Sequence, residues 1–204
     1  MMRPLLLLAT TNAGKLAELH ALLSGKGVDL TDLIQEQIKA TIPEEGADYA
    51  ENALAKAVGY ARLSGLWTLA DDTGLEVDAL GGEPGLRSAR AAGDDAARRA
   101  KLLARLAALP RPWVARFRCV VALASPGGEN ATGRGVCEGE VIPEERGENG
   151  FGYDPIFLVA GTGKTMAELS AETKNHLGHR GGAVEDLFRR HQRGALPGAP
   201  FLLG

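Results

Sequence analysis

The sequence predicts an α/β protein built on a mixed β-sheet. Strand-like and helix-like stretches alternate in the first half of the chain, which is typical of parallel strands joined by helical connections. Two later strand-like stretches follow one another directly, as in an antiparallel hairpin. The chain of 204 residues is 45% hydrophobic and can bury a sizeable core, so we expect residues 1–204 to form a single domain.

The first half predicts a strand, a helix, a short strand and a second helix. The apolar run at 4–9 predicts a buried strand, because it is far too short for a signal peptide or a membrane span. Leucines at helical spacing predict a helix over 16–23, and a short strand is expected at 28–30. An alanine-rich helix is expected over 48–63, with a strand at 66–70 behind it.

The second half opens on residues 71–93, which are rich in glycine and are expected to form loops around a site. Period-two alternation and turn residues then predict the remaining elements. These are a helix from Asp94 or Asp95 to Leu109, a hairpin of strands 114–124 and 132–142, a strand at 156–159 and a helix at 183–191.

Charge and cysteine content restrict the function. The net charge of −3 offers no basic field for a nucleic acid, so we expect no nucleic-acid partner, and we expect no membrane partner. Cys119 and Cys137 lie in strand-like stretches without the spacing of a zinc site. Both are expected to be core residues of a protein in the reducing cytoplasm.

The loop "TTNAGK", residues 10–15, predicts a phosphate-binding site. It joins the first strand to the start of a helix, where backbone N–H groups and the helix dipole favour an anion. Gly14 permits close backbone approach, and Lys15 adds a positive charge. An ordinary turn with a surface lysine is the alternative. The six residues of the loop are Thr10, Thr11, Asn12, Ala13, Gly14 and Lys15.

A second stretch, "GTGKT" at 161–165, resembles the end of a P-loop. The P-loop spacing requires glycine at position 158, which is Leu158 here, and no helix is predicted behind the stretch. We therefore interpret it as an ordinary turn.

Acidic residues predict a magnesium site. Asp71 and Asp72 follow the strand at 66–70, and strand alternation sends their side chains to opposite faces of the sheet. Glu44 and Glu45 precede the second helix, and one carboxylate from each pair would give Mg²⁺ two hard oxygen ligands. The alternative is that these pairs are solvated surface charges or helix caps.

Two further groups are candidates for substrate contacts. Asn52 and Lys56 share one face of the second helix and are placed to overhang the same site as Glu44, although a solvated lysine is the default. Late in the chain, aromatic rings and cationic donors suit a purine base whose edge is rich in acceptors, such as a 6-keto purine. The alternative is that these are core and surface residues. The late group comprises Phe151, Gly152, Tyr153, Asp154, Lys174, His179 and Arg180.

Five stretches in register resemble the inosine triphosphate pyrophosphatase family, whose members are dITP/XTP pyrophosphatases. They are "TTNAGK", "PEE…ENALAKA", "ADDTGLEVDALGGEPGLRSAR", "FGYDPIF" and "GKTMAELSAETKNHLGHRGGA". The resemblance covers about Leu5 to Leu187. It implies an elongated, twisted mixed sheet flanked by helices, with two lobes and a central cleft, in a homodimer. It also implies Mg²⁺-dependent hydrolysis of ITP, dITP and XTP to the monophosphate and pyrophosphate.

The resemblance also implies roles for individual residues. Asp72 resembles the metal-binding general base, Glu44 a second metal ligand, and Lys56 a second phosphate-binding lysine beside the loop 10–15. The residues that resemble nucleotide contacts are Thr73, Phe151 to Asp154, Lys174, His179 and Arg180, the last two reading the 6-keto edge.

One departure from the family pattern is Gly178, where relatives usually carry serine before the His-Arg pair. The missing hydroxyl leaves open how strictly the base is selected, and the choice of Glu44 over Glu45 also stays open. Two other functions remain: a nucleotide-binding module without catalysis, and a broader nucleotide pyrophosphatase that acts on pyrimidine or modified nucleotides.

Overall fold

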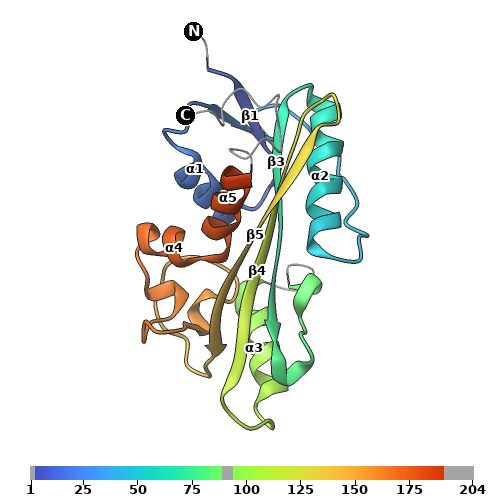
Figure 1. The fold of residues 1–204 in the computed structure, drawn as a ribbon. Coiled ribbons are helices and arrows are strands. Elements are labelled where there is room, and N and C mark those ends of the chain that lie inside the picture. Colours follow the sequence, from blue (N-terminus) through green and yellow to red (C-terminus); the bar gives the residue numbers. More distant parts are fainter. Residues whose placement is uncertain (1–2, 89–93, 191–204) are drawn as a thin grey trace. The chain divides into compact units, whose positions relative to one another are not determined.

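The computed structural model describes residues 3–88 and 94–190, which form a six-stranded sheet with helices on its faces (Figure 1). The strands, in the spatial order β2-β1-β3-β4-β5-β6, are β1 (Leu5–Leu8), β2 (Asp29–Asp32), β3 (Trp67–Val77), β4 (Trp113–Ala124), β5 (Asn130–Val141) and β6 (Phe157–Val159). The α-helices of the described residues are α1 (Ala13–Leu23), α2 (Tyr49–Ser64), α3 (Asp95–Leu106), α4 (Ala171–Leu177) and α5 (His179–Arg190).

The sheet is mixed, as the sequence predicts. β1 pairs in parallel with β2 on one side and with β3 on the other, and helices connect these strands. β5 pairs antiparallel with β6. β4 and β5 are neighbours joined by a short turn, which confirms the predicted hairpin.

The described residues divide into two compact units. The first comprises the residues up to Asp72, Cys119–Gly135 and those from Arg180 on, and the second comprises Thr73–Arg118 and Val136–His179. β3, β4 and β5 each contribute residues to both units. The expected central cleft and the single-domain organisation remain predictions.

In the first unit, the strands bury both of their faces. Alternate residues of β1, β3 and β4 pack against α1 and α5 on one face and against α2 on the other (Figure 1). The first face includes Leu6, Leu8, Leu69, Val121, Leu19 and Leu187. The second includes Leu7, Ala70, Ala122, Ala53, Ala57 and Tyr60. The alanines of α2 therefore face the sheet, as their spacing indicates.

The second unit has one core, which includes residues from the parts of β3, β4 and β5 that belong to this unit. Phe117 of β4 and Phe157 of β6 lie in it with ring centroids 4.7 Å apart, and Leu102 and Leu106 of α3 close it. Cys137 lies in this core and Cys119 lies in the core of the first unit, and neither of the two forms a disulfide bond. The prediction that both are core residues is confirmed.

The prediction that residues 71–93 are irregular is wrong at its start. β3 continues to Val77, so Asp71 and Asp72 lie in the middle of a strand. Leu75 and Val77 are buried in the second core, and this burial outweighs the low strand propensity of the aspartates and of Gly74. The 3₁₀ turns Asp78–Leu80 and Gly85–Arg87 follow, and residues 89–93 lie outside the described residues.

The C-terminal helices also differ from the prediction. α5 begins at His179 rather than at 183, and α4, which the sequence analysis missed, precedes it. Ser170 caps α4 by accepting a hydrogen bond from the Thr173 amide at 3.2 Å. Gly181 and Gly182 have low helix propensity, so the sequence pattern does not predict a helix at the start of α5. The side chains of His179 and Arg180 in this first turn are buried.

The remaining predicted elements agree with the structure within a few residues. Asn12, Asp48 and Asp94 cap α1, α2 and α3 with their side chains. The "GTGKT" stretch at 161–165 forms a turn after β6 and is followed by the 3₁₀ turn Met166–Glu168 rather than by an α-helix, so it is not a P-loop. Within residues 3–88 and 94–190, no helix is both long and apolar enough to cross a membrane.

Candidate active site

The loop after β1 is shaped by its own side chains. The Asn12 amide donates to Thr10 Oγ1 at 3.2 Å, and Asn12 Oδ1 accepts from the Lys15 amide at 3.0 Å. Thr11 is exposed, and Ala13 and Gly14 begin α1, where the first-turn amides have no acceptor within the helix. The loop therefore presents backbone donors and the positive end of the α1 dipole, as the phosphate-binding prediction requires.

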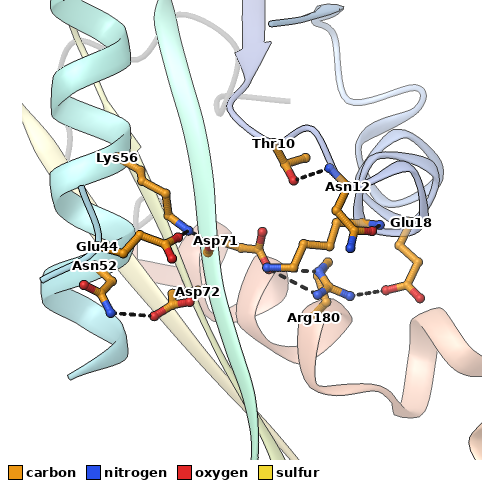
Figure 2. Close-up of polar contacts among 10 residues, drawn as sticks. Thr10, Asn12, Glu18, Glu44, Asn52, Lys56, Asp71, Asp72 and Arg180 are labelled. Atoms are coloured by element: carbon orange, nitrogen blue, oxygen red, sulfur yellow. Dashed lines mark hydrogen bonds and ion pairs between the residues drawn. The ribbon is translucent and has the colours of Figure 1, made fainter. Parts of the chain in front are cut away.

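Asp71 binds two of the cations that the sequence singles out. Its Oδ2 lies 2.9 Å from Lys15 Nζ and 3.1 Å from Arg180 Nη2, and its side chain is fully buried (Figure 2). Arg180 also contacts Glu18 of α1. These contacts fix the Lys15 ammonium next to the start of α1.

The buried charges shift one another's pKa. Burial raises the pKa of the Asp71 carboxyl, but Lys15, Arg180 and Lys56 lower it by more, so it lies well below its ordinary value. Burial lowers the pKa of Arg180, but its anionic neighbours, with Asp71 first, together raise it by more. Asp71 is therefore a permanent anion that neutralises and positions its cationic neighbours.

Asp72 points to the opposite side of β3, toward α2 (Figure 2). Asn52 Nδ2 donates to Asp72 Oδ2 at 2.9 Å, and Asn52 Oδ1 accepts from the Gly46 amide at 2.8 Å. Asn52 thus connects the loop before α2 to the carboxylate on β3. The prediction that the two aspartates face opposite ways is confirmed.

Lys56 lies between the acidic residues of this face. Its Nζ contacts the Glu44 carboxylate and donates to the Asp71 carbonyl oxygen at 2.6 Å. Burial lowers the pKa of Lys56, but the nearby carboxylates, with Asp71 first, raise it by more. Burial raises the pKa of Asp72 above its ordinary value, against the opposing effect of Lys56.

Asp72 and Glu44 fit a hard cation by their chemistry. Glu44 is half-buried against Lys56 and raises the pKa of Asp72 through its charge, whereas Glu45 is exposed. This arrangement favours Glu44 over Glu45 as a partner of Asp72. Among the described residues, no group of three or more His, Cys, Asp or Glu side chains forms a metal cage. Two carboxylates suffice for Mg²⁺ that also binds phosphate and water.

In the second unit, a lysine and a carboxylate lie beside an aromatic ring. Asp154 Oδ2 accepts from the Phe151 amide at 2.9 Å and contacts Lys174 Nζ. The same Nζ lies 5.0 Å from the centroid of the Phe151 ring. This part of the predicted base-recognition group is therefore brought together.

The loop that carries these residues is attached to α3. The Gly152 amide donates to Asp95 Oδ2 at 2.7 Å, and Arg99 Nη1 donates to the Gly152 carbonyl oxygen at 2.9 Å. Gly152 has a φ of +63°, which favours glycine. Tyr153 is buried beside α3, so its side chain belongs to the α3 side of the loop.

His179 and Arg180 have different surroundings, although they are adjacent in sequence. The His179 ring stacks on Phe117 with centroids 4.7 Å apart and planes 16° apart, whereas Arg180 contacts Asp71 and Glu18. Consecutive helical residues point in different directions. Thr73 lies half-buried in β3, next to Asp72.

Two residues at these clusters, Phe117 and Glu18, were not predicted from the sequence and carry no motif of their own. Asp71 was named with Asp72 as a candidate metal ligand, and in the structure it binds Lys15 and Arg180. Period-two alternation on β4 marks Phe117 as a core residue, and no sequence pattern distinguishes a core ring from one that stacks on a functional histidine.

Gly178, the departure from the family pattern, ends α4. Its amide donates to the Lys174 carbonyl oxygen at 2.8 Å, and a Cβ at this position would lie 2.4 Å from the same oxygen. A serine here would therefore shift the end of α4, which carries Lys174.

Curated proteins of similar sequence align with most of this chain. A dITP/XTP pyrophosphatase of Desulforamulus reducens is 47% identical over 184 residues, which are 88% of this chain and 92% of the relative. A dITP/XTP pyrophosphatase of Bacillus subtilis is 43% identical over 187 residues, which are 90% of this chain and 94% of the relative.

Solved structures match the fold. The HAM1 protein from Coxiella burnetii superimposes with a TM-score of 0.82 at 38% identity, over 94% of this chain and 100% of that chain. The Ham1 protein of Staphylococcus aureus gives a TM-score of 0.79 at 36% identity, over 93% and 98% of the two chains. The sequence profile of the Ham1 family matches residues 6–190. This chain therefore belongs to the Ham1 family.

Proposed function

We propose that this chain hydrolyses non-canonical purine nucleoside triphosphates, namely ITP, dITP and XTP, to the nucleoside monophosphate and pyrophosphate. The names of its relatives support the reaction, because both relatives described above are dITP/XTP pyrophosphatases. The observation that carries the proposal is the buried cluster in which Asp71 and Asp72 face opposite sides of one strand, each next to a lysine.

The triphosphate is proposed to bind at the start of α1. The first-turn amides, the α1 dipole and the Lys15 ammonium offer donors and positive charge to phosphate oxygens. Lys56 offers a second ammonium from α2. Because Asp71 fixes Lys15 at 2.9 Å, the cation requires little reorganisation when a phosphate group arrives.

Asp72 is proposed to accept the proton of the attacking water. Without a bound cation, burial raises the pKa of this carboxyl, which favours proton uptake from water. The Asn52 amide fixes the orientation of this carboxylate. Water then attacks the α-phosphorus, the bond from that phosphorus to the bridging oxygen breaks, and pyrophosphate leaves with Lys15 and Lys56 offsetting its charge.

Mg²⁺ is the proposed cofactor, held by Asp72 and Glu44. When bound, it would neutralise triphosphate charge and polarise the reacting phosphoryl group. Lys56 already offsets the charge of these carboxylates in the structure, and this contact is expected to loosen when a cation binds.

Base recognition is assigned to Phe151, Asp154, Lys174 and His179, with Arg180 as a further donor. The Phe151 ring offers a stacking surface, and Asp154 and Lys174 offer an acceptor and a donor beside it. A 6-keto purine presents acceptors to such donors, whereas the amino group of adenine does not.

The setting of this activity is also a proposal. The resemblance to the family supports a homodimer, and two buried cysteines outside any disulfide fit the reducing cytoplasm, where the nucleotide pool is found.

Hydrolysis of dITP with Mg²⁺ in ¹⁸O-labelled water tests the reaction. The label is expected in the monophosphate and not in pyrophosphate, since the water oxygen is transferred to the α-phosphorus. Label in orthophosphate would indicate removal of the terminal phosphate instead. Binding without any turnover would indicate a nucleotide-binding module, and the Asp72→Asn variant provides the inactive control.

A further inference from the structure

The second unit contains a cavity of about 380 Å³ beside α3. Its walls come from the segment after β3, from one face of α3 and from the loop that precedes β6. The lining residues are Glu83, Pro84, Arg87, Arg98, Lys101, Leu102, Arg105 and Tyr153.

The cavity is strongly cationic. Arg98, Lys101 and Arg105 recur at helical spacing on α3 and therefore share the face that borders the cavity. Arg87 adds a fourth cation from the segment after β3, and Glu83 is the one carboxylate among the lining residues. The side chains around the cavity therefore carry a clear excess of positive charge.

Two of these cations already have carboxylate partners. Arg105 Nη2 lies 2.7 Å from Glu83 Oε2, and Arg98 contacts Asp95. Arg87 and Lys101 form no ion pair with any carboxylate of residues 3–88 and 94–190, and both are exposed. An anion in the cavity would therefore meet two charges that no described carboxylate neutralises.

The floor of the cavity is apolar. Leu102 and Tyr153 are 4% and 5% exposed, and Pro84 adds a further apolar surface. Burial raises the pKa of the Tyr153 hydroxyl, with Arg98 opposing that effect, so the hydroxyl is a neutral donor at physiological pH. An apolar floor with a few charged groups at the rim is typical of sites for small organic anions.

We propose that this cavity is a binding site for a small phosphate-bearing anion. Arginine side chains present paired N–H donors that match phosphate oxygens, and lysine adds a point charge. The volume lies at the lower end of the range for small-molecule sites, which suits pyrophosphate or a nucleoside monophosphate.

This proposal does not rest on the proposed reaction. Arg87, Lys101 and Arg105 have no part in it, and Tyr153 is the one lining residue that the family resemblance also assigns to the nucleotide. Two sources of the same chemistry are available, because hydrolysis of a triphosphate would release both pyrophosphate and a monophosphate.

Isothermal titration calorimetry without divalent metal tests the site. Inorganic pyrophosphate and inosine monophosphate are titrated separately into the wild type, the Arg87→Ala/Lys101→Ala variant and the Lys164→Ala variant. Lys164 is an exposed cation of the same unit that does not line the cavity, so it provides the matched control.

We expect one binding event of the wild type and the control to be about 100-fold weaker in the double variant. This corresponds to a dissociation constant that rises on the order of tenfold for each lost charged contact. The anion whose affinity falls more in the double variant, pyrophosphate or inosine monophosphate, is the one that the cavity binds. Equal affinity and stoichiometry in the double variant and the control would overturn the proposal.

Turnover of dITP separates this site from the proposed active site. The kcat and KM of the double variant are expected to match those of the Lys164→Ala control. A rise in KM that parallels the loss of pyrophosphate or monophosphate binding would make the cavity part of the substrate site and contradict a separate one. If the wild type does not hydrolyse dITP at all, the proposed function fails, and the calorimetry still decides whether the cavity binds an anion.

Discussion

Asp71 and Asp72 are chemically identical neighbours whose surroundings give them different roles. Asp71 is fully buried and paired with Lys15 and Arg180, whereas Asp72 accepts one amide hydrogen bond from Asn52 and has a raised pKa. Charge compensation is therefore the role proposed for Asp71, and proton transfer is the role proposed for Asp72.

Replacing each aspartate by asparagine separates these roles. Asp72→Asn is expected to reduce turnover by about 100-fold or more, the range of a lost general base, with little change in melting temperature. Asp71→Asn leaves Lys15 and Arg180 buried without their shared anion, so we expect it to destabilise the fold by about 3–5 kcal/mol. Turnover and calorimetric melting of both variants check this, and an Asp72→Asn enzyme with more than about a tenth of the wild-type rate would contradict the role of Asp72.

Asn52 acts through two hydrogen bonds, one to Asp72 and one to the loop that carries Glu44. Asn52→Ala removes both and is expected to lower kcat by about tenfold, which corresponds to roughly 1.4 kcal/mol of lost orientation. The exposed Asn130→Ala variant of the hairpin provides the control. Steady-state kinetics with dITP test the prediction, and a change in KM alone would show that Asn52 binds substrate rather than orients Asp72.

At the element scale, β5 approaches α5 so closely that only glycine fits at position 133. A Cβ on Gly133 would lie 2.2 Å from the Ala183 carbonyl oxygen and 2.4 Å from the Leu187 amide nitrogen, both backbone atoms. Relief of this overlap requires movement of the helix or the strand, because no side chain can give way.

Gly133→Ala is therefore expected to lower the free energy of unfolding by about 1–3 kcal/mol, the usual cost of overpacking. Gly182→Ala on α5 is the matched control, because its nearest contact beyond the helix would be 3.6 Å. The control should be neutral or stabilising by up to about 1 kcal/mol, since alanine favours helix. Denaturant unfolding measures both, and equal stabilities would show that the strand and helix are not in close contact.

Local patterns predicted the elements that have local signals. Leucine spacing, the alanine-rich stretch before Gly65, a capping aspartate at 94 or 95 and period-two alternation in the hairpin identified α1, α2, α3, β4 and β5. The extension of β3 beyond Asp71 and the start of α5 were missed, because tertiary burial there outweighs residues with low intrinsic propensity.

The sequence predicted which residues belong to the candidate site, but it did not predict which of them contact one another. Loop position and family resemblance identified Lys15, Lys56 and Asp72 from sequence. The ion pair between Asp71 and Arg180 joins residues 109 positions apart, and no local pattern encodes such a contact. For the same reason, the stacking of His179 on Phe117 was found only in the structure.

At the scale of the whole molecule, the candidate chemistry is distributed over both units. The charged cluster that suits a triphosphate lies in the first unit, and the group of Phe151, Asp154 and Lys174 lies in the second. The second unit also contains the cationic cavity beside α3. The family match over residues 6–190 includes residues of both units.

The central claim is that this chain removes pyrophosphate from 6-keto purine triphosphates outside the standard set. The most direct test measures kcat/KM for pyrophosphate release with Mg²⁺ from dITP, XTP, dGTP, dATP and dUTP. We expect dITP and XTP to exceed dATP and dUTP by at least about 100-fold, because neither dATP nor dUTP presents the 6-keto purine edge and the donors of the site would be left unpaired. dGTP shares the 6-keto group, so its value tests recognition at position 2 of the purine. Similar values for all five substrates would contradict the assignment of base recognition and indicate a broader nucleotide pyrophosphatase.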